Sequence, residues 1–312
     1  MENLIISFNA VMPMFLIMAL GSVLRWKKMM SEHTQGQLNN LAFRVFIPFL
    51  LINGIYNTDL RQVFQLKLIV FTMVSILIMW LCATALVMKI DKRPQKRGAM
   101  IQAICRSNYT LFGLAILGNL YGADSIGIPS LLVAVVLPPF NALAVITLQV
   151  FCGRKVEIKE ILIEVAKNPF IIAVATGIVI SYLQLQLPVF IESTLSSVSG
   201  MAMPVALVAM GASLNLEKTF QDHKNLSIAV IGKLVVVPLI FVPITVLFGF
   251  RGIELASLMA IFASPTAVVS YVMADQMNSD AELASAAIIL STVISCFTMF
   301  LWIFILKQLG LI

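Results

Sequence analysis

The sequence predicts an all-α polytopic membrane protein whose ten transmembrane helices form two inverted five-helix repeats. Three observations predict this class: an apolar composition, ten separate runs long enough to span a bilayer, and a similarity between the two halves of the chain. The predicted division is residues 1–152 for the first repeat, 153–167 for a short cytoplasmic linker, and 168–312 for the second repeat.

The composition is that of a chain buried in lipid. Hydrophobic residues make up 60% of the sequence and charged residues 12%, against about 45–50% and 25% in soluble domains. A crossing needs about 20 apolar residues, so 312 residues leave room for ten crossings and for no separate soluble domain. The net charge of +6 comes from short basic runs between apolar segments, which predicts topology signals and no nucleic-acid partner.

Motifs of enzymes and metal sites are absent from the sequence. The four cysteines form no CxxC pair, so neither a disulfide framework nor a zinc site is predicted. We also find no HExxH, GxSxG, P-loop or dinucleotide motif. We therefore predict a protein that is not an enzyme and that needs no cofactor or metal.

Ten apolar runs of spanning length follow one another along the chain. They cover residues 5–25, 38–56, 66–88, 99–121, 128–151, 168–187, 195–215, 226–248, 253–274 and 283–306. The amino terminus lacks the basic start of a signal peptide, which favours a retained first helix. The fourth and ninth runs are the weakest, because polar residues interrupt them. The 153–167 linker reads equally well as an amphipathic segment or a solvated loop.

Lysine and arginine are distributed unevenly over the alternate loops. The chain has 21 such residues. Four lie on one side, Arg61, Lys67, Arg251 and Lys307, and three lie inside the runs, Arg44, Arg106 and Lys233. The remaining 14 lie on the other side. Because positive loops stay in the cytoplasm, this imbalance predicts a cell-membrane protein with both termini on the extracytoplasmic side.

The chain resembles itself at an offset of 156 residues, half its length. The coinciding pairs are Pro13 with Pro169, Gly21 with Gly177, Pro48 with Pro204, and Asp124 with Asp280. With 12 prolines in 312 residues, one proline meets another by chance about 4% of the time (12/312), so two such pairs favour a repeat over convergent helix punctuation. Five crossings per half is an odd number, so the halves must be inverted, an architecture that favours a carrier over an anchor.

The interrupted fourth and ninth runs are the predicted binding site. In inverted-repeat carriers, broken helices present their N-termini to an anion near the midplane. The fourth run carries Arg106, Ser107, Asn108 and Thr110, and the ninth carries Ser264, Pro265 and Thr266, with Asn108 falling on Ser264 at the offset. Pro265 removes a backbone donor within the membrane. The alternatives are a simple proline kink and, for Asn108, an interhelical hydrogen bond.

The charges deep inside the runs are all positive, namely Arg44, Arg106 and Lys233, whereas the acidic residues lie in loops or near the ends of the runs. A buried cation needs a partner or a water-filled cavity, and without deep carboxylates a small carboxylate substrate fits that need. Arg44 and Lys233 could instead extend to the membrane surface. The same absence argues against a sodium/proton exchanger. Asn141 and Asn53 are further polar residues at membrane depth, either in the cavity or in packing.

Two segments resemble the auxin efflux carrier family, which includes plant auxin exporters and bacterial malate and dicarboxylate permeases. They are SNYTLFGLAILGNLYG at 107–122 and FASPTAVVSYVMADQM at 262–277, and the likeness covers nearly the whole chain. The resemblance implies that helices four and nine cross, that spans one, two, six and seven form a scaffold, and that the rest moves as an elevator. It also implies a homodimer joined through the scaffold, a bacterial-type member, and carboxylate binding by Asn108 and the residues around Pro265.

These observations predict a secondary transporter of small mono- or dicarboxylates, malate-like or auxin-like. The binding residues are the two polar clusters with Asn141 and Asn53, and Arg106 or Lys233 supplies positive potential. Two alternatives stay open: a channel or sensory membrane protein, and a relative of the bile-acid/sodium symporters.

Overall fold

A computed structural model describes residues 2–57, 65–122, 125–151, 163, 166–213 and 222–312. Asp124 and most of the predicted 153–167 linker lie outside these residues. Every regular element in the described part is a helix. Seven helices are long and apolar enough to cross a membrane, and three shorter apolar helices, Tyr109–Tyr121, Pro169–Tyr182 and Gly252–Ala263, accompany them. The protein is therefore an all-helical, multi-pass membrane protein.

The helices follow the chain in the order predicted from the apolar runs. The first half contains α1 (Glu2–Trp26), α2 (Glu32–Leu41), η1 (Ala42–Phe46), α3 (Ile47–Tyr56), α5 (Leu66–Ile90), α6 (Pro94–Cys105), η2 (Tyr109–Gly113), α7 (Leu114–Tyr121) and α8 (Gly127–Phe151). The second half contains α10 (Pro169–Tyr182), α11 (Val189–Gly200), α12 (Ala202–Ser213), α13 (His223–Ile231), η5 (Gly232–Val236), α14 (Val237–Leu247), α15 (Gly252–Ala263), α16 (Val269–Gln276) and α17 (Ala281–Gln308). The η elements are short π-helical segments within longer helices.

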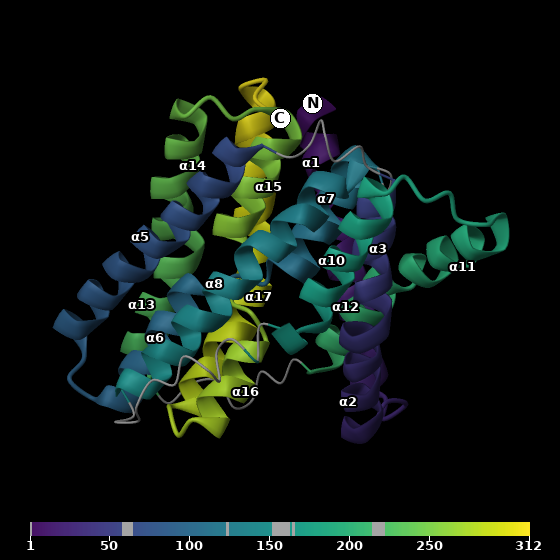
Figure 1. Ribbon diagram of the computed structural model, residues 1–312. Helices are drawn as coiled ribbons and strands as arrows, with labels where there is room; N and C mark the ends of the chain where they lie inside the picture. Colours follow the sequence, from purple (N-terminus) through teal and green to yellow (C-terminus); the bar gives the residue numbers. More distant parts are fainter. Residues whose placement is uncertain (1, 58–64, 123–124, 152–162, 164–165, 214–221) are drawn as a thin grey trace.

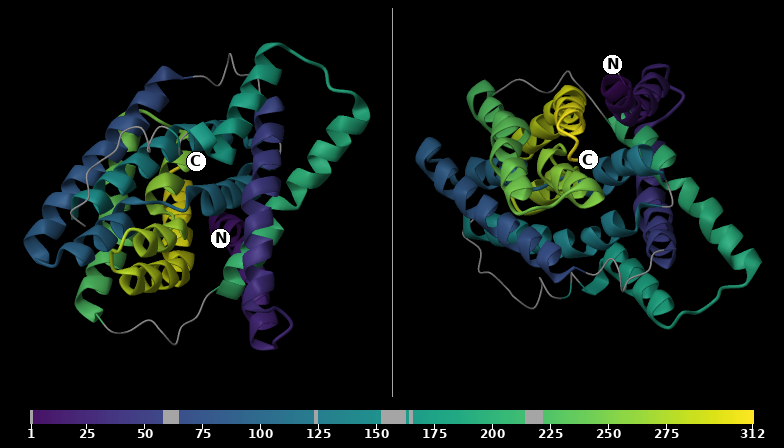
Figure 2. Two further views of the ribbon diagram at one scale, coloured as in Figure 1. Left: turned by 60° about the horizontal axis from the view of Figure 1, so that its bottom comes forward. Right: turned by 90° about the horizontal axis from the view of Figure 1, so that it is seen from above.

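The helices pack as two groups that stand side by side (Figure 1). The smaller group consists of α1, α2, η1, α3, α10, α11 and α12, and its strongest contacts are α1 with α12 and α10 with α3. The larger group consists of α5, α6, η2, α7, α8 and α13 to α17. The groups meet where α1 contacts α7 and α17 and where α3 contacts α8. The view from above in Figure 2 shows the same division.

The helix bounds recur along the chain at a nearly constant spacing. Adding 157 to 66–90 gives 223–247, the bounds of the span His223–Leu247, and adding 157 to 32–56 gives 189–213, the bounds of Val189–Ser213. The two chain ends also lie together (Figure 1): the Asn3 side-chain amide donates to the Lys307 carbonyl at 3.4 Å. Both termini therefore lie at the same end of the helix bundle.

The fourth and ninth predicted spans are each divided into two helices, at the polar residues that predicted their interruption. The 99–121 run is divided between α6 and η2/α7, and the 253–274 run between α15 and α16. The sixth helix ends at Tyr182 instead of residue 187. Apolar composition could not locate the two breaks, because burial in protein lets residues 106–108 and 264–267 leave the helix inside the membrane.

Two glycines bring α1 and α12 into backbone contact. A methyl group added at Gly211 would lie 1.9 Å from the Met18 carbonyl oxygen, and one at Gly21 would lie 2.1 Å from the Val208 oxygen. The Ser22 hydroxyl donates to the Gly211 carbonyl across the same contact at 2.7 Å. Small residues at such crossings allow close packing of membrane helices.

Gly211→Ala is expected to lower the free energy of unfolding by about 1–3 kcal/mol, the usual cost of overpacking, because the helices must separate. The measurement is the thermal unfolding midpoint of the detergent-solubilised protein. Gly36→Ala in α2 is the matched control, since nothing lies within 4 Å of its added methyl and alanine is the better helix former. Equal midpoints for the two variants would contradict the close contact.

A network of charges joins four helices at one end of the larger group. Asp91 follows α5 and is 7% exposed, and it pairs with Arg93 at 2.5 Å and accepts from the Asn225 amide of α13 at 2.7 Å. Asp222 pairs with Lys96 of α6 and with Arg93. Asp280 caps the start of α17, and its carboxylate lies 3.9 Å from the Lys96 ammonium nitrogen. The network fixes these helix ends to one another.

Acid is expected to weaken this network. The Arg93 guanidinium holds the pKa of Asp91 well below its ordinary value, and the Lys96 ammonium lowers the pKa of Asp222. A carboxylate with a lowered pKa stabilises the fold above its unfolded pKa, about 3.9, and loses that contribution as pH falls through the folded pKa.

The unfolding midpoint should therefore fall as pH is lowered from neutral through about 4. Asp91→Asn should be less stable at neutral pH and should lose less on acidification. Glu32→Gln is the control, because Glu32 pairs with Arg25 but is 88% exposed, and exposed pairs contribute little. Equal acid sensitivity of Asp91→Asn and the unchanged protein would exclude the network as its cause.

Candidate functional site

The two helix breaks meet and cross in the interior of the larger group. The chain leaves α6 at Arg106, whose backbone is extended, and leaves α15 at Ser264 in the same way. The backbone amide of Asn108 donates to the Pro265 carbonyl at 2.8 Å, and the backbone amide of Ala267 donates to the Arg106 carbonyl at 3.1 Å. These bonds form a short antiparallel bridge between the broken helices, so the two predicted clusters come together.

The crossing is enclosed by protein. Every residue from 98 to 117 and from 255 to 267 is buried. Pro265 accounts for the second break, because it cannot donate within a helix. The first break contains no proline. There, the backbone hydrogen bonds to the segment around Pro265 replace the missing helical bonds. They satisfy backbone N–H and C=O groups that lipid could not satisfy.

Thr266 anchors the crossing. Its hydroxyl donates to the Ala103 carbonyl of α6 at 2.8 Å, and its backbone amide donates to the Ser291 hydroxyl of α17 at 3.1 Å. Thr266 is 1% exposed. Its hydroxyl is thus already used within the protein, and its position favours a structural role over ligand binding.

Three other polar groups at the crossing lack strong partners. The hydroxyls of Ser107 and Ser264 are buried, and neither has a hydrogen-bond partner among the residues that the structure describes. The Asn108 side-chain amide, 6% exposed, contacts the Met210 sulfur of α12 at 3.8 Å, and a thioether is a weak acceptor. Buried polar groups are normally paired, so these three groups, which we call the polar surface of the crossing, are candidates to bind a polar ligand.

Arg106 supplies a buried cation beside the crossing. It is 6% exposed, and its guanidinium donates to the Asn141 side-chain oxygen of α8 and contacts the Met273 sulfur of α16. The fold therefore brings together Arg106 and Asn141, two residues that were each predicted to belong to the site. Thr110, also buried, lies in η2, directly after the first break.

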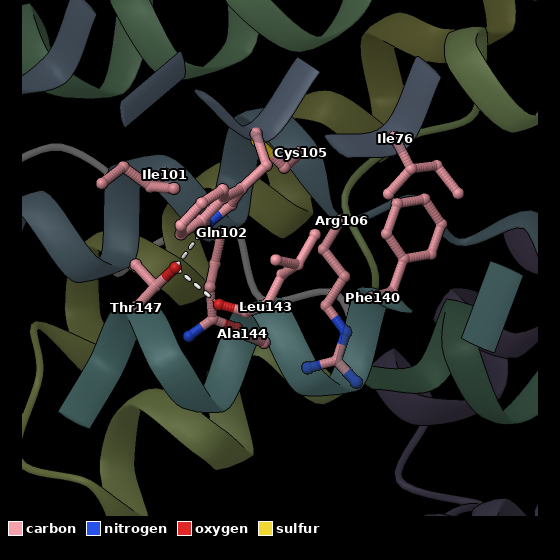
Figure 3. Close-up of a pocket in the computed structure, with 10 residues that line it drawn as sticks. Ile76, Ile101, Gln102, Cys105, Arg106, Phe140, Leu143, Ala144 and Thr147 are labelled. Carbon is pink, nitrogen blue, oxygen red and sulfur yellow. Dashed lines mark hydrogen bonds between the residues drawn. The ribbon is translucent and has the colours of Figure 1, made fainter. Parts of the chain in front are cut away.

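Gln102 is a polar residue of this region that sequence reasoning missed. Figure 3 shows Gln102 and Arg106 extending from α6 toward α8 into a small space. Gln102 is 2% exposed, and within the described part of the chain neither its amide nitrogen nor its oxygen has a partner. The space, about 10 Å³, is about the size of one water. The sequence feature that could have identified Gln102 is a glutamine within the apolar run 99–121.

A larger cavity of about 290 Å³ lies between the two groups of helices. We call it the α1–α7 cavity. The smaller group contributes Pro13, Ser199, Pro204 and Leu207, and the larger group contributes Leu114, Ala115 and Asn119, among others. Leu207 lies one turn from Met210, the residue that contacts Asn108, so the cavity adjoins the crossing. Its size is near the lower limit of small-molecule sites, about 300 Å³.

Neither Asn53 nor Lys233 is among the residues that line the α1–α7 cavity. The Asn53 amide donates to Ser199 at 3.3 Å, so it reaches the α1–α7 cavity only through that residue. Lys233 is fully enclosed within η5 of the larger group. The expectation that Arg44 is buried is wrong: it is exposed in η1, in agreement with the alternative that it extends to the membrane surface.

Asn119 and Ser199 were also missed by the sequence analysis, because both lie at helix ends where polar residues are common. Asn119 additionally donates to the Ala10 carbonyl of α1 at 2.9 Å, across the boundary between the two groups. In the described ranges, no cluster of three or more histidine, cysteine or acidic residues could hold a metal.

Comparison with known proteins gives consistent matches. A family model described as "Membrane transport protein" matches residues 6–160 and 153–303. An uncharacterized transporter of Methanothermobacter thermautotrophicus is 23% identical over 300 residues, which cover 95% of this chain and 97% of that protein. A putative malonate transporter of Rhizobium meliloti is 27% identical over 135 residues, 43% of this chain and 42% of that protein.

Proposed function

Because this chain belongs to the membrane transport protein family, the family of auxin efflux carriers, we propose that it is a secondary transporter of small carboxylates. The observation that carries the proposal is the crossing of two broken helices, where buried polar groups without strong partners lie beside a buried arginine. Membership of a transport family also favours a carrier over an enzyme.

The arrangement of charge and donors suits a carboxylate. Arg106 can pair with an anion through charge-assisted hydrogen bonds, which are stronger than neutral ones. The hydroxyls of Ser107 and Ser264 and the Asn108 amide offer further donors. The α1–α7 cavity, which is lined by Leu207 one turn from Met210, would hold a substrate close to the crossing. Thr110 and Asn141 support the site by flanking the crossing and holding Arg106.

The name of one relative suggests which carboxylate to test first. The putative malonate transporter of Rhizobium meliloti makes malonate, a small dicarboxylate, the first candidate. Malate and monocarboxylates follow, because the polar surface offers few groups that would distinguish them.

We propose that transport uses an inverted repeat and an elevator movement. The recurrence of helix bounds at a spacing of 157 residues supports two five-helix repeats, 1–152 and 168–312. The smaller group would be the scaffold, and would also join two copies as a homodimer. The larger group, which contains the whole crossing and is tied together by the charge network, would move. The charge imbalance of the loops supports a topology with both termini on the extracytoplasmic side.

Asn108→Ala is expected to lower malonate counterflow by about 10-fold, the equivalent of roughly 1.4 kcal/mol for one lost hydrogen bond to a charged ligand. The assay is exchange of radiolabelled malonate across proteoliposomes containing the purified protein. Asn57→Ala is the matched control, since Asn57 is exposed at the end of α3, and it should exchange at the original rate.

Saturable counterflow by the unchanged protein would support a carrier, whereas flux without counterflow would indicate a channel. Full activity of a folded Asn108→Ala variant would remove Asn108 from the site. Failure of mono- and dicarboxylates alike to exchange would contradict the proposed function itself.

A further inference from the structure

Lys233 is the most enclosed charged side chain of the larger group. It is 0% exposed, and its ammonium nitrogen has no hydrogen-bond or salt-bridge partner among the described residues. Arg106, in contrast, is also buried but donates to Asn141. Burial of an unpaired ammonium is costly, so the presence of Lys233 at this depth requires a physical reason.

The neighbours of Lys233 place it directly behind the crossing. The π-helical segment η5 packs against α6 and α15, the two helices that end in the breaks, and against α13, α14 and α17. A methyl group added at Gly232 would lie 3.1 Å from the Ile104 side chain, two residues before Arg106. Cys105 is the last residue of α6, the helix against which η5 packs. π-Helical segments often occur at functional sites.

The helices around η5 offer Lys233 no acidic partner within the membrane. Their described titratable groups, apart from Cys105, lie at helix ends or, for Cys296, at a half-buried position: Lys96 and Arg97 on α6, Glu254 on α15, His223 and Lys224 on α13, and Glu282, Cys296 and Lys307 on α17. Lys96 is already paired with Asp222, and Glu254 accepts from Gln65. Among the described residues, no carboxylate of these helices therefore pairs with Lys233.

Resting on the proposed transport of carboxylates, we propose that Lys233 is the proton-binding site that couples proton movement to substrate movement. An anion at the crossing stabilises the ammonium, and the ammonium stabilises the anion. Without the anion, the neutral amine is the state compatible with burial. Two forms of the carrier can then cross the bilayer: the form with protonated Lys233 and bound carboxylate, and the empty form with a neutral Lys233 amine.

The cycle balances protons, and the Lys233 proton offsets one negative charge of the substrate. A monocarboxylate therefore moves without net charge, whereas a dicarboxylate such as malonate moves one negative charge per turn. On the acidic side, the Lys233 amine takes a proton from water as the carboxylate binds. On the other side, the carboxylate leaves and the ammonium returns its proton to water. One proton thus moves with each substrate, in the same direction, and no other reactant is needed. The protonated empty form is held back by the cost of moving an unpaired charge.

Proteoliposomes of the full chain test this coupling. Radiolabelled malonate is supplied outside at a lower pH than inside, and a trapped dye reports the lumenal pH. We expect malonate entry to acidify the lumen. With the membrane voltage held at zero by equal potassium and valinomycin, a gradient of about one pH unit should support roughly tenfold accumulation, because both ratios then represent the same free energy. A protonophore should abolish the accumulation, and protein-free vesicles set the background.

Two substitutions assign the proton to Lys233. Lys233→Met should lose both lumenal acidification and pH-driven accumulation, with residual malonate uptake that follows membrane voltage. Lys233→Arg keeps the charge, so it should exchange malonate but lose net uptake, because the empty form cannot return. Lys89→Met, at an exposed position at the end of α5, is the matched control and should remain coupled.

The outcomes separate the two proposals. Malonate exchange without any lumenal acidification in the unchanged protein would overturn proton coupling and leave the transport proposal intact. Acidification that persists in Lys233→Met would overturn the role of Lys233. The absence of exchange for any carboxylate would instead count against the proposed function.

Discussion

Arg106→Gln is expected to reduce carboxylate transport by roughly 100-fold. Removing one partner from a buried ion pair costs about 3 kcal/mol or more, and each 1.4 kcal/mol is a factor of about ten. Glutamine can still donate to Asn141, so it preserves a hydrogen bond to α8 while it removes the positive charge. The loss should therefore reflect the substrate and not the fold.

The measurement is the malonate concentration dependence of exchange in proteoliposomes. If Arg106 pairs with the substrate, the apparent affinity should fall with the maximum rate, and a thermal unfolding midpoint near that of the unchanged protein would confirm folding. Arg106→Lys should recover part of the activity, because it restores the charge without the planar guanidinium.

Arg44→Gln is the matched control for charge removal. Arg44 is also an arginine within an apolar run, but it is exposed in η1, so its replacement should leave exchange within about twofold, as expected when only a weak, solvent-screened charge is lost. Equal losses in the Arg106 and Arg44 variants would indicate a general effect of positive charge and would contradict direct pairing at the crossing.

Arg44 and Lys233 show where sequence reasoning reaches its limit. Both are single cations in apolar runs, yet Arg44 is exposed and Lys233 is fully enclosed. Which face of a helix meets protein depends on the neighbouring helices, and an apolar run carries little periodic pattern when lipid and protein are equally apolar. The contact between Arg106 and Asn141 depends on the same tertiary information.

The helix breaks were easier to predict. Pro265 cannot continue a backbone hydrogen-bond ladder, and the polar run 106–110 is costly in lipid, so both interruptions are local consequences of residue type. The partners that replace the lost bonds are not local. The bond from Asn108 to Pro265 joins residues 157 positions apart (265 − 108), which only the packed fold brings together.

A cross-link between the two groups of helices should stop transport reversibly. Asn119 of α7 donates to the Ala10 carbonyl of α1, so cysteines at positions 10 and 119 lie at a contact that joins the larger and smaller groups. An elevator movement must break this contact during every cycle. Oxidation of the pair, with the native cysteines replaced, is expected to remove nearly all malonate exchange, and a reductant should restore it.

The control pair, positions 95 and 279, lies within the larger group. The Ser279 hydroxyl donates to the Gln95 carbonyl at 2.6 Å, the same kind of side-chain to carbonyl contact as the one between Asn119 and Ala10. Cross-linking there joins α6 to the segment between α16 and α17, which move together if the larger group is one rigid body. Exchange should then survive oxidation. Block by the 95–279 pair would show that the larger group itself deforms, and continued exchange with the 10–119 pair fully cross-linked would contradict movement of one group against the other.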